Sequence, residues 1–360
     1  MDLARSNNHI FLIIKKNKCR NGAFMQVREG DLLGTKDDII FDVKGLVHPQ
    51  SKVIAFPRFI PDSRGNRAHE NLNYVKVYSL SERFQFLEQK YPHYIVYDSI
   101  FDEKLCEVPL KDVKHYYQPI NRLQELRCSE NLDALERDVL EFMELLKNNA
   151  NVPWNTMGIS GSLLAKLHTP KSDIDPIIYG SRNCRRVHEA LKSLIYETKS
   201  HVKAYSTKEL RELFNFRVRD TQVPFKDFVR TESRKVLQGK FRNREYFMRF
   251  VKDWGEIDEK YGEIRYKNVG YANIKAIIED DSEAIFTPCS YKIKNVEILE
   301  GTRFPIEEIV SFRGRFCEQA RKSEIVIAQG KVEKAMDTRR NREFFRLLIG
   351  NKPSDFIILG

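Results

Sequence analysis

Residues 157–180 constrain the fold of this chain more than any other segment, because apolar runs and polar junctions alternate within them. The apolar runs predict strands over residues 154–159 and 173–179, and the segments that follow predict helices over 162–168 and 183–198. A strand, a helix, a second strand and a second helix in this order place both strands in one sheet. We therefore expect a core of mixed sheet and helices in the middle of the chain.

Gly161 and Ser162 stand where the first strand meets its helix. The first N–H groups of a helix lack backbone partners and suit an anion such as phosphate, which a glycine lets approach and a hydroxyl can contact. Asp173 and Asp175 share a face, because residues i and i+2 of a strand point the same way. Two such carboxylates repel each other unless a divalent cation lies beside them, so they predict a Mg²⁺ or Mn²⁺ site for the phosphates of a nucleotide.

Gly-Ser, a gap of eleven residues and Ser-Asp-Ile-Asp before an apolar strand resemble the core motif of the DNA polymerase β-type nucleotidyltransferase superfamily. The Pro-Lys pair before Ser172 is similar to what many small members carry. With Phe-Thr-Pro-Cys at residues 286–289 and the segment 311–320, the whole chain looks like an uncharacterised archaeal branch of predicted nucleotidyltransferases.

The resemblance implies a two-metal transfer of a nucleoside monophosphate from an NTP to a hydroxyl acceptor, with release of pyrophosphate. It implies that Asp173 and Asp175 hold the metals. The nucleotide-binding residues that follow from it are Gly161, Ser162, Lys171 and Ser172.

A third carboxylate on a neighbouring strand usually completes such a site. Residues 279–281 are three acids at the end of a predicted strand, and Asp280 is our candidate among them for a catalytic role, although an acidic hairpin turn explains them equally well. Pro176 departs from the motif, because proline lacks the N–H that an interior strand uses. The strand is therefore either bulged there or the site is altered.

Each half of the motif is weak evidence alone, since an isolated Asp-x-Asp is usually a solvated pair and an isolated Gly-Ser is usually a turn. Their combination, spacing and apolar flanks favour an enzyme. The alternative is a nucleic-acid-binding protein whose transferase core is inert, with Pro176 as the mark of its decay.

The apolar residues change from strand-like to helix-like spacing near residue 121 and back near residue 266, which predicts an α+β fold in three parts. Residues 1–120 form a β-rich N-terminal domain, with a first strand at 10–14; residues 121–265 form the nucleotidyltransferase core with a basic helical insertion. Apolar residues at steps of three and four from Leu132 to Leu146 indicate a helix capped by Asn131. Residues 266–360 form a β-rich C-terminal domain, a small barrel or a sandwich.

The net charge of +10 points to a polyanionic partner, with RNA favoured over DNA. Residues 201–252 hold 14 basic and six acidic residues, so most of the surplus lies beside the expected site, unless these charges merely cover a solvated helical face. Six scattered cysteines without a CxxC pair, and no long apolar run, favour a reducing cytoplasm without a zinc site or a membrane span. The candidate nucleic-acid-binding residues are Arg234, Lys235, Arg242, Arg244, Arg313 and Arg315.

Overall fold

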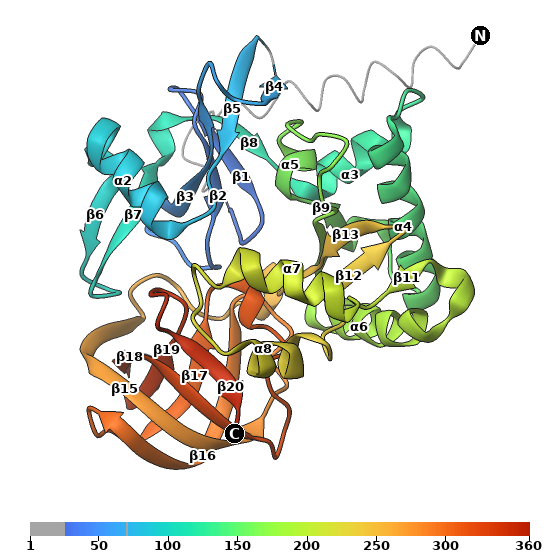
Figure 1. The fold of residues 1–360 in the computed structure, drawn as a ribbon. Helices are drawn as coiled ribbons and strands as arrows, with labels where there is room; N and C mark the ends of the chain where they lie inside the picture. Colours follow the sequence, from blue (N-terminus) through green and yellow to red (C-terminus); the bar gives the residue numbers. More distant parts are fainter. Residues whose placement is uncertain (1–25, 70) are drawn as a thin grey trace.

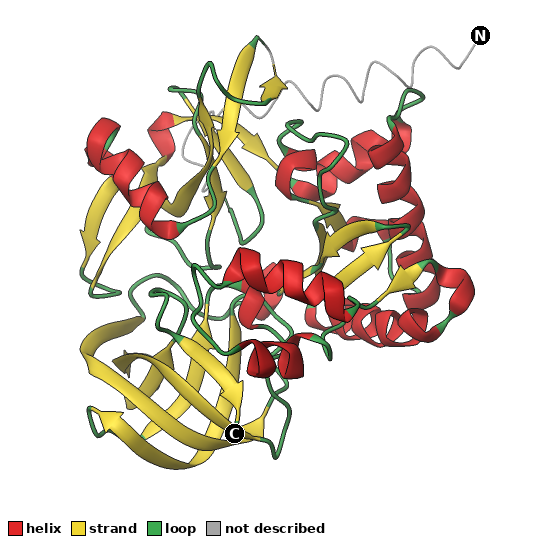
Figure 2. Ribbon diagram, in the orientation of Figure 1, coloured by secondary structure: helices red, strands yellow, loops and turns green. Residues whose placement is uncertain are grey.

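The computed structural model describes residues 26–69 and 71–360, which form an α+β fold of three bodies (Figure 1). The predicted strand at residues 10–14 lies outside this part of the chain. Figure 2 shows that most helices gather in the middle body, while the other two consist mainly of strands. None of the helices in the described residues is long and apolar enough to cross a membrane.

The first body is an antiparallel sheet in the order β4-β5-β3-β2-β1-β8, in which β7 also pairs with β3 and β6 with β7. One helix, α2 (Leu80–Lys90), begins after Ser79, whose hydroxyl accepts a hydrogen bond from the Glu82 N–H at 3.1 Å. The strands are β1 (Leu32–Thr35), β2 (Ile40–Val43), β3 (Lys52–Pro61), β4 (Arg67–His69), β5 (Leu72–Lys76), β6 (Ile95–Asp98), β7 (Glu103–Pro109) and β8 (Val113–Tyr117).

The middle body is built on a three-stranded sheet. Strand β10 (Pro176–Tyr179) lies between β9 (Met157–Ile159), which is antiparallel to it, and β14 (Arg249–Val251), which is parallel. Figure 1 shows the helices packed around this sheet and α7 lying between the three bodies. The helices are α3 (Pro119–Cys128), α4 (Ala134–Ala150), α5 (Gly161–Leu164), α6 (Ser181–Tyr196), α7 (Thr207–Arg217) and α8 (Phe225–Glu232).

The basic segment after α6 is only partly helical, which corrects the predicted helical insertion. After α8 the chain forms a hairpin of β12 (Gln238–Phe241) and β13 (Arg244–Phe247), with β11 (Val202–Lys203) at its edge. The two turn residues, Arg242 and Asn243, have φ of 50° and 71°. This left-handed pair is the geometry of a two-residue hairpin turn, and an Arg-Asn turn carries a weaker sequence signal than Asn-Gly.

The third body closes into a barrel, because β15 pairs with both β16 and β18 and the path β15-β16-β17-β19-β18 returns to its start. Strands β17 and β19 are parallel, whereas the other barrel pairs are antiparallel. This Greek-key path has the connectivity of an OB-fold barrel. The strands are β15 (Ile264–Asp280), β16 (Cys289–Gly301), β17 (Ile306–Ser311), β18 (Ile325–Asp337), β19 (Arg342–Leu348) and β20 (Phe356–Leu359), the last pairing with the first half of β18.

A single apolar cluster continues from the middle body into the barrel. Phe250 on β14 forms a bridge with Phe286, which lies between β15 and β16, and the Thr287 N–H donates to the Phe250 carbonyl at 2.8 Å. Both phenylalanine side chains are buried. The middle body and the barrel therefore share one hydrophobic interior, and we expect them to unfold together.

Replacing Phe250 with alanine should lower the free energy of unfolding by about 3–5 kcal/mol, because it removes a buried ring and leaves a cavity. Urea unfolding followed by tryptophan fluorescence and circular dichroism should show one shifted transition. Phe216→Ala is the control, since this ring is 58% exposed and its loss should cost little. Two separate transitions in the Phe250 variant would contradict the shared interior.

Candidate active site

The Gly-Ser turn and the Asp-x-Asp segment meet at one point of the fold. The Ser160 N–H, just after β9, donates to the Asp175 carbonyl at 2.9 Å. Gly161 then opens α5 with φ of +62°, and a Cβ built on it would overlap the Asp175 carboxylate, at 2.7 Å from its Cγ. Both the left-handed backbone and the close approach require a glycine at this position.

Ser162 is buried behind this contact. Its side chain is fully covered, and its Oγ has no hydrogen-bond partner among the described residues. Ser160 donates instead to the Gly30 carbonyl, at 2.7 Å, and so ties the turn to the first body. Helix α5 ends at Leu164, so the helix predicted over 162–168 is a single turn, whose dipole is correspondingly small.

Asp173 and Asp175 lie on one face of an extended segment. Between them, the Ile174 N–H donates to the Glu245 carbonyl and the Ile174 carbonyl accepts from the Phe247 N–H, both at 2.9 Å. Ile174 is fully buried, so the two carboxylates point to the opposite face. The same ladder places Glu245 beside Asp173 on that face, because Ile174 is paired in parallel with the residue after Glu245.

Glu245 is the acid that sequence reasoning missed. It is exposed on β13, and desolvation together with the charge of Asp173 raises its pKa, against the opposing effect of Lys240. The alternation of buried Tyr246, Met248 and Phe250 with more exposed residues has the period of a strand, but nothing in the sequence indicates that this strand lies beside Ile174.

Asp280 occupies a different place, at the end of β15 in the barrel. Its carboxylate accepts hydrogen bonds from the N–H and the hydroxyl of Ser282, at 2.9 and 3.0 Å, and these bonds lower its pKa. This is the acidic hairpin turn that the sequence also allowed, and within the described residues no hydrogen bond or ion pair joins Asp280 to the Asp-x-Asp segment. Glu245 therefore replaces Asp280 as the candidate third acid.

Pro176 marks the start of a strand. It is the first residue of β10, a position that tolerates a missing N–H, and the ladder with β14 begins one residue later, where Ile177 lies opposite Arg249. Neither pairing of β10 shifts its register. The proline therefore leaves the sheet intact.

Cations from two bodies surround the carboxylate pair. Burial, and then the charge of Asp173, raises the pKa of Asp175 to about 6, while Lys76, Arg249 and Arg58 oppose this rise. Lys76 lies on β5 and Arg58 on β3, so the pair sits where the N-terminal sheet meets the middle body. Without a bound cation, this site disfavours two full negative charges.

The remaining predicted nucleotide-binding residues lie on the turn before the pair. Lys171 is exposed. Ser172 is buried, and its hydroxyl accepts a hydrogen bond from the Thr169 N–H at 2.9 Å and lies 3.4 Å from Nη1 of Arg67. Ser172 therefore shapes the turn, while Lys171 is free to reach a ligand.

A different trio has the spacing of a preformed metal site. Oxygen or nitrogen atoms of Asp133, Glu136 and His168 all lie within 4.8 Å of one another, a spacing that the three acids of the candidate site do not reach. Asp133 and Glu136 form the capping box of α4, and Glu136 also pairs with Arg122 at 2.7 Å. Hydrogen bonding explains this trio without an ion.

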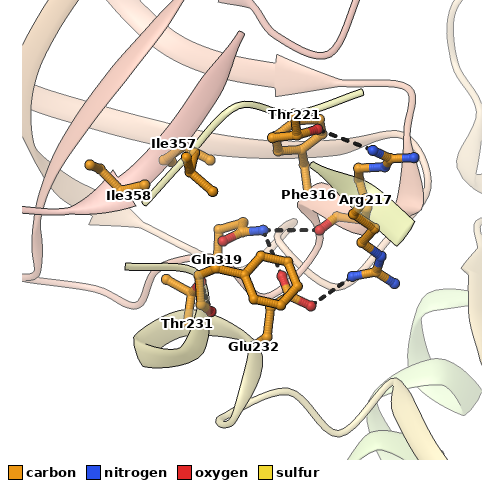
Figure 3. Close-up of a pocket in the computed structure, with 11 residues that line it drawn as sticks. Arg217, Thr221, Thr231, Glu232, Phe316, Gln319, Ile357 and Ile358 are labelled. Atoms are coloured by element: carbon orange, nitrogen blue, oxygen red, sulfur yellow. Dashed lines mark hydrogen bonds and ion pairs between the residues drawn. The ribbon is translucent and has the colours of Figure 1, made fainter. Parts of the chain in front are cut away.

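Two of the six candidate nucleic-acid-binding residues lie inside the fold after α8. Arg234 Nη2 donates to Oε2 of Glu324 at 3.0 Å, and the buried Lys235 has its Nζ 2.6 Å from Oε1 of Glu232. Glu232 also pairs with Arg217, at 2.7 Å, an interaction that a dashed line marks in Figure 3. Both residues line a cavity of about 20 Å³. That volume holds about one water molecule.

The hairpin arginines form ion pairs with α4, although the Arg242 side chain stays 41% exposed. Arg244 pairs with Asp138 and donates to the Pro170 carbonyl at 2.7 Å. Arg242 pairs with Glu141 and lies 3.6 Å from Asp138. These bonds fix the β12–β13 hairpin to the middle body.

Arg313 and Arg315 share one carboxylate. Their guanidinium groups lie 3.1 and 3.3 Å from Oδ2 of Asp220. Burial, and then the charges of Arg313 and Arg217, lower the pKa of Arg315 to about 9. All six predicted residues thus form ion pairs within the fold, and among them only Arg242 has an exposed side chain.

Comparison with known proteins identifies the family of this chain. The uncharacterized protein MJ1086 of Methanocaldococcus jannaschii is 32% identical over 340 residues, which cover 92% of this chain and 98% of that protein. The chain belongs to the family of MJ1086. No family model matches the sequence, and no solved structure matches it.

Replacing Asp175 with asparagine should stabilise the metal-free protein at pH 8 by about 2–3 kcal/mol. The folded-state pKa of about 6 exceeds the unfolded value of 3.8, so the carboxyl lowers stability as the pH rises through this window, and asparagine removes that cost. Urea unfolding with a chelator at pH 4 and pH 8 measures the free energy of unfolding of both proteins. The difference in stability between variant and wild type should vanish at pH 4. Asp280→Asn, whose carboxyl has a lowered pKa, should give no gain; a pH-independent effect of Asp175→Asn would refute the assignment.

Proposed function

We propose that this protein is a metal-dependent nucleotidyltransferase, which moves a nucleoside monophosphate from an NTP to a hydroxyl acceptor. The contact between Gly161 and the Asp175 carboxylate carries the proposal, because it unites the two halves of the motif in one site. In the reaction, a bond forms from the acceptor oxygen to the α-phosphorus while the bond to the pyrophosphate oxygen breaks. The hydroxyl proton passes to a carboxylate or to water.

The donor atoms fit Mg²⁺ or Mn²⁺, because hard cations take carboxylate oxygens. Asp173 and Asp175 would hold the ions, with Glu245 on the neighbouring strand as the third acid. The raised pKa of Asp175 reports a carboxylate whose charge the metal-free protein compensates poorly. Binding would require side-chain rotations, because the ligand atoms of the three acids do not all lie within 4.8 Å of one another. Bound ions would neutralise charge on the attacking and leaving oxygens.

The turn residues support a nucleotide as the ligand. A buried hydroxyl without a partner costs about 1–3 kcal/mol, and the Ser162 Oγ is such a group next to Gly161. We propose that Gly161 and Ser162 contact the phosphates and that Lys171, exposed on the preceding turn, reaches them from solvent.

The acceptor is proposed to be an RNA end. The OB-type connectivity of the barrel supports this by analogy, since many such barrels bind single strands. Because the six predicted basic residues are engaged in ion pairs, we propose Lys208, Arg219 and Lys226 as contacts; all three are exposed on or between α7 and α8. The alternative is an inert core that only binds nucleic acid. The spacing of Asp173, Asp175 and Glu245 favours this alternative, because their ligand atoms do not all lie within 4.8 Å of one another.

Asp173→Asn, Asp175→Asn and Glu245→Gln should each lower nucleotide transfer more than about 100-fold, because each removes a charge that faces the metals. The assay measures transfer of label from NTPs to total RNA in the presence of Mg²⁺ or Mn²⁺. Calorimetry should show that each of the three variants binds Mn²⁺ more weakly than wild type. Asp280→Asn should retain full activity. Transfer at the wild-type rate by Asp173→Asn would exclude the proposed site, and RNA binding by wild type without transfer would favour the inert core.

Replacing Lys208, Arg219 and Lys226 together with alanine should weaken binding of single-stranded RNA and flatten its salt dependence by about 2 in log Kd against log salt. Each lysine or arginine that contacts a phosphate releases a counterion, so removing three lowers the slope. Titrations at four salt concentrations measure it. Lys192 and Lys199, exposed on and after α6, give the control double variant. An unchanged slope in the triple variant would place the RNA elsewhere.

A further inference from the structure

Lys76 is a nearly buried cation directed at the Asp-x-Asp pair from another domain. It is the last residue of β5, its side chain is 6% exposed, and its Nζ lies 3.8 Å from Oδ1 of Asp173. No hydrogen bond joins this Nζ to any described residue. The ring of Tyr78 lies 5.2 Å from this Nζ, with Arg58 also 5.2 Å from the same ring, and the ammonium charge acts on Asp175 as well.

The position of Lys76 is fixed by the preceding strand. Arg67 on β4 donates from Nη1 to the Leu167 carbonyl at 2.6 Å, so the β4–β5 hairpin is attached to the turn before the aspartates. A buried ammonium group is costly unless close hydrogen bonds replace its hydration shell. One ion pair at 3.8 Å and an aromatic face replace it incompletely, which leaves Lys76 able to bind an anion that enters the site.

We propose that Lys76 binds the β- and γ-phosphates of the nucleotide, so that the N-terminal domain completes the active site. This inference rests on the proposed function. In the free protein the ammonium lies beside Asp173 and partly neutralises the carboxylate pair. With a metal-bound NTP in the site, Asp173 and Asp175 would hold the cation, and the Lys76 ammonium would be free to donate to the phosphates. Every charge then has a partner, and recognition of the triphosphate depends on a residue outside the transferase core.

The test compares nucleotides that differ only in phosphate number. The NTP that wild type binds best in the presence of Ca²⁺ is chosen by calorimetry from ATP, GTP, CTP and UTP, and its di- and monophosphates are titrated next. Lys76→Met should weaken NTP binding about 10–100-fold, the usual effect of a lost charge-assisted hydrogen bond, and monophosphate binding less than about threefold. Lys76→Arg should recover most of the loss, since it restores the charge.

Lys104→Met is the matched control, because this lysine is in the same domain and forms an ion pair of similar length, 3.7 Å to Glu88, with its side chain 64% exposed. It should bind every nucleotide as wild type does. Equal losses for mono- and triphosphate in Lys76→Met, or no loss, would overturn the inference. If thermal unfolding of Lys76→Met shows no cooperative transition, Lys76→Gln takes its place in the titrations.

The same titrations separate this inference from the proposed function. If Asp173→Asn abolishes NTP binding while Lys76→Met leaves it intact, the site stands and Lys76 has no role in binding phosphate. If wild type binds neither Mn²⁺ nor any NTP, the proposed function itself fails, and the inference falls with it.

Discussion

The contact between the Gly161 backbone and the Asp175 carboxylate is the constraint on which the centre of this molecule depends. It requires a left-handed glycine at the end of β9, an extended segment at residues 173–175, and a turn between them that brings the chain back. Any larger side chain at Gly161 would displace the carboxylate, and with it the face that Glu245 and Lys76 share. The position of this acid is therefore set by backbone packing, whereas its ionisation is set by its neighbours.

Local patterns predicted what local interactions determine. The helix at α4 was predicted from the spacing of its apolar residues, although Asp133 caps it in place of Asn131, because Asp133 can form a capping box with Glu136. The α+β class and the placement of both aspartates on one extended segment were likewise readable. The place of Glu245 in the site could not be predicted, because it depends on which strand lies beside Ile174. Pairing between strands about seventy residues apart leaves no periodic signal in the sequence.

The basic surplus shows that a count of charges does not locate a binding surface. Arg234, Lys235 and Arg244 looked like a free cationic surface, yet each meets an acid from a distant part of the chain. Such pairs contribute little where exposed, but leaving one partner buried and unpaired costs about 3–5 kcal/mol. Sequence counts cannot separate charges that pair within the fold from those left for a partner, because the pairing is a tertiary property.

A layer of buried charges also explains how the N-terminal domain can contribute to the site. Arg249 on β14 lies 3.2 Å from Glu29, which pairs with Lys44 at 3.1 Å, and Lys44 reaches Asp42 at 2.8 Å. Apolar surfaces can slide past one another, whereas charged partners must meet in one register. Since Arg249 also acts on Asp175, the interaction that orients the domain is coupled to the carboxylate pair. A cation on β5 can therefore be held at a defined distance from Asp173 without belonging to the middle body.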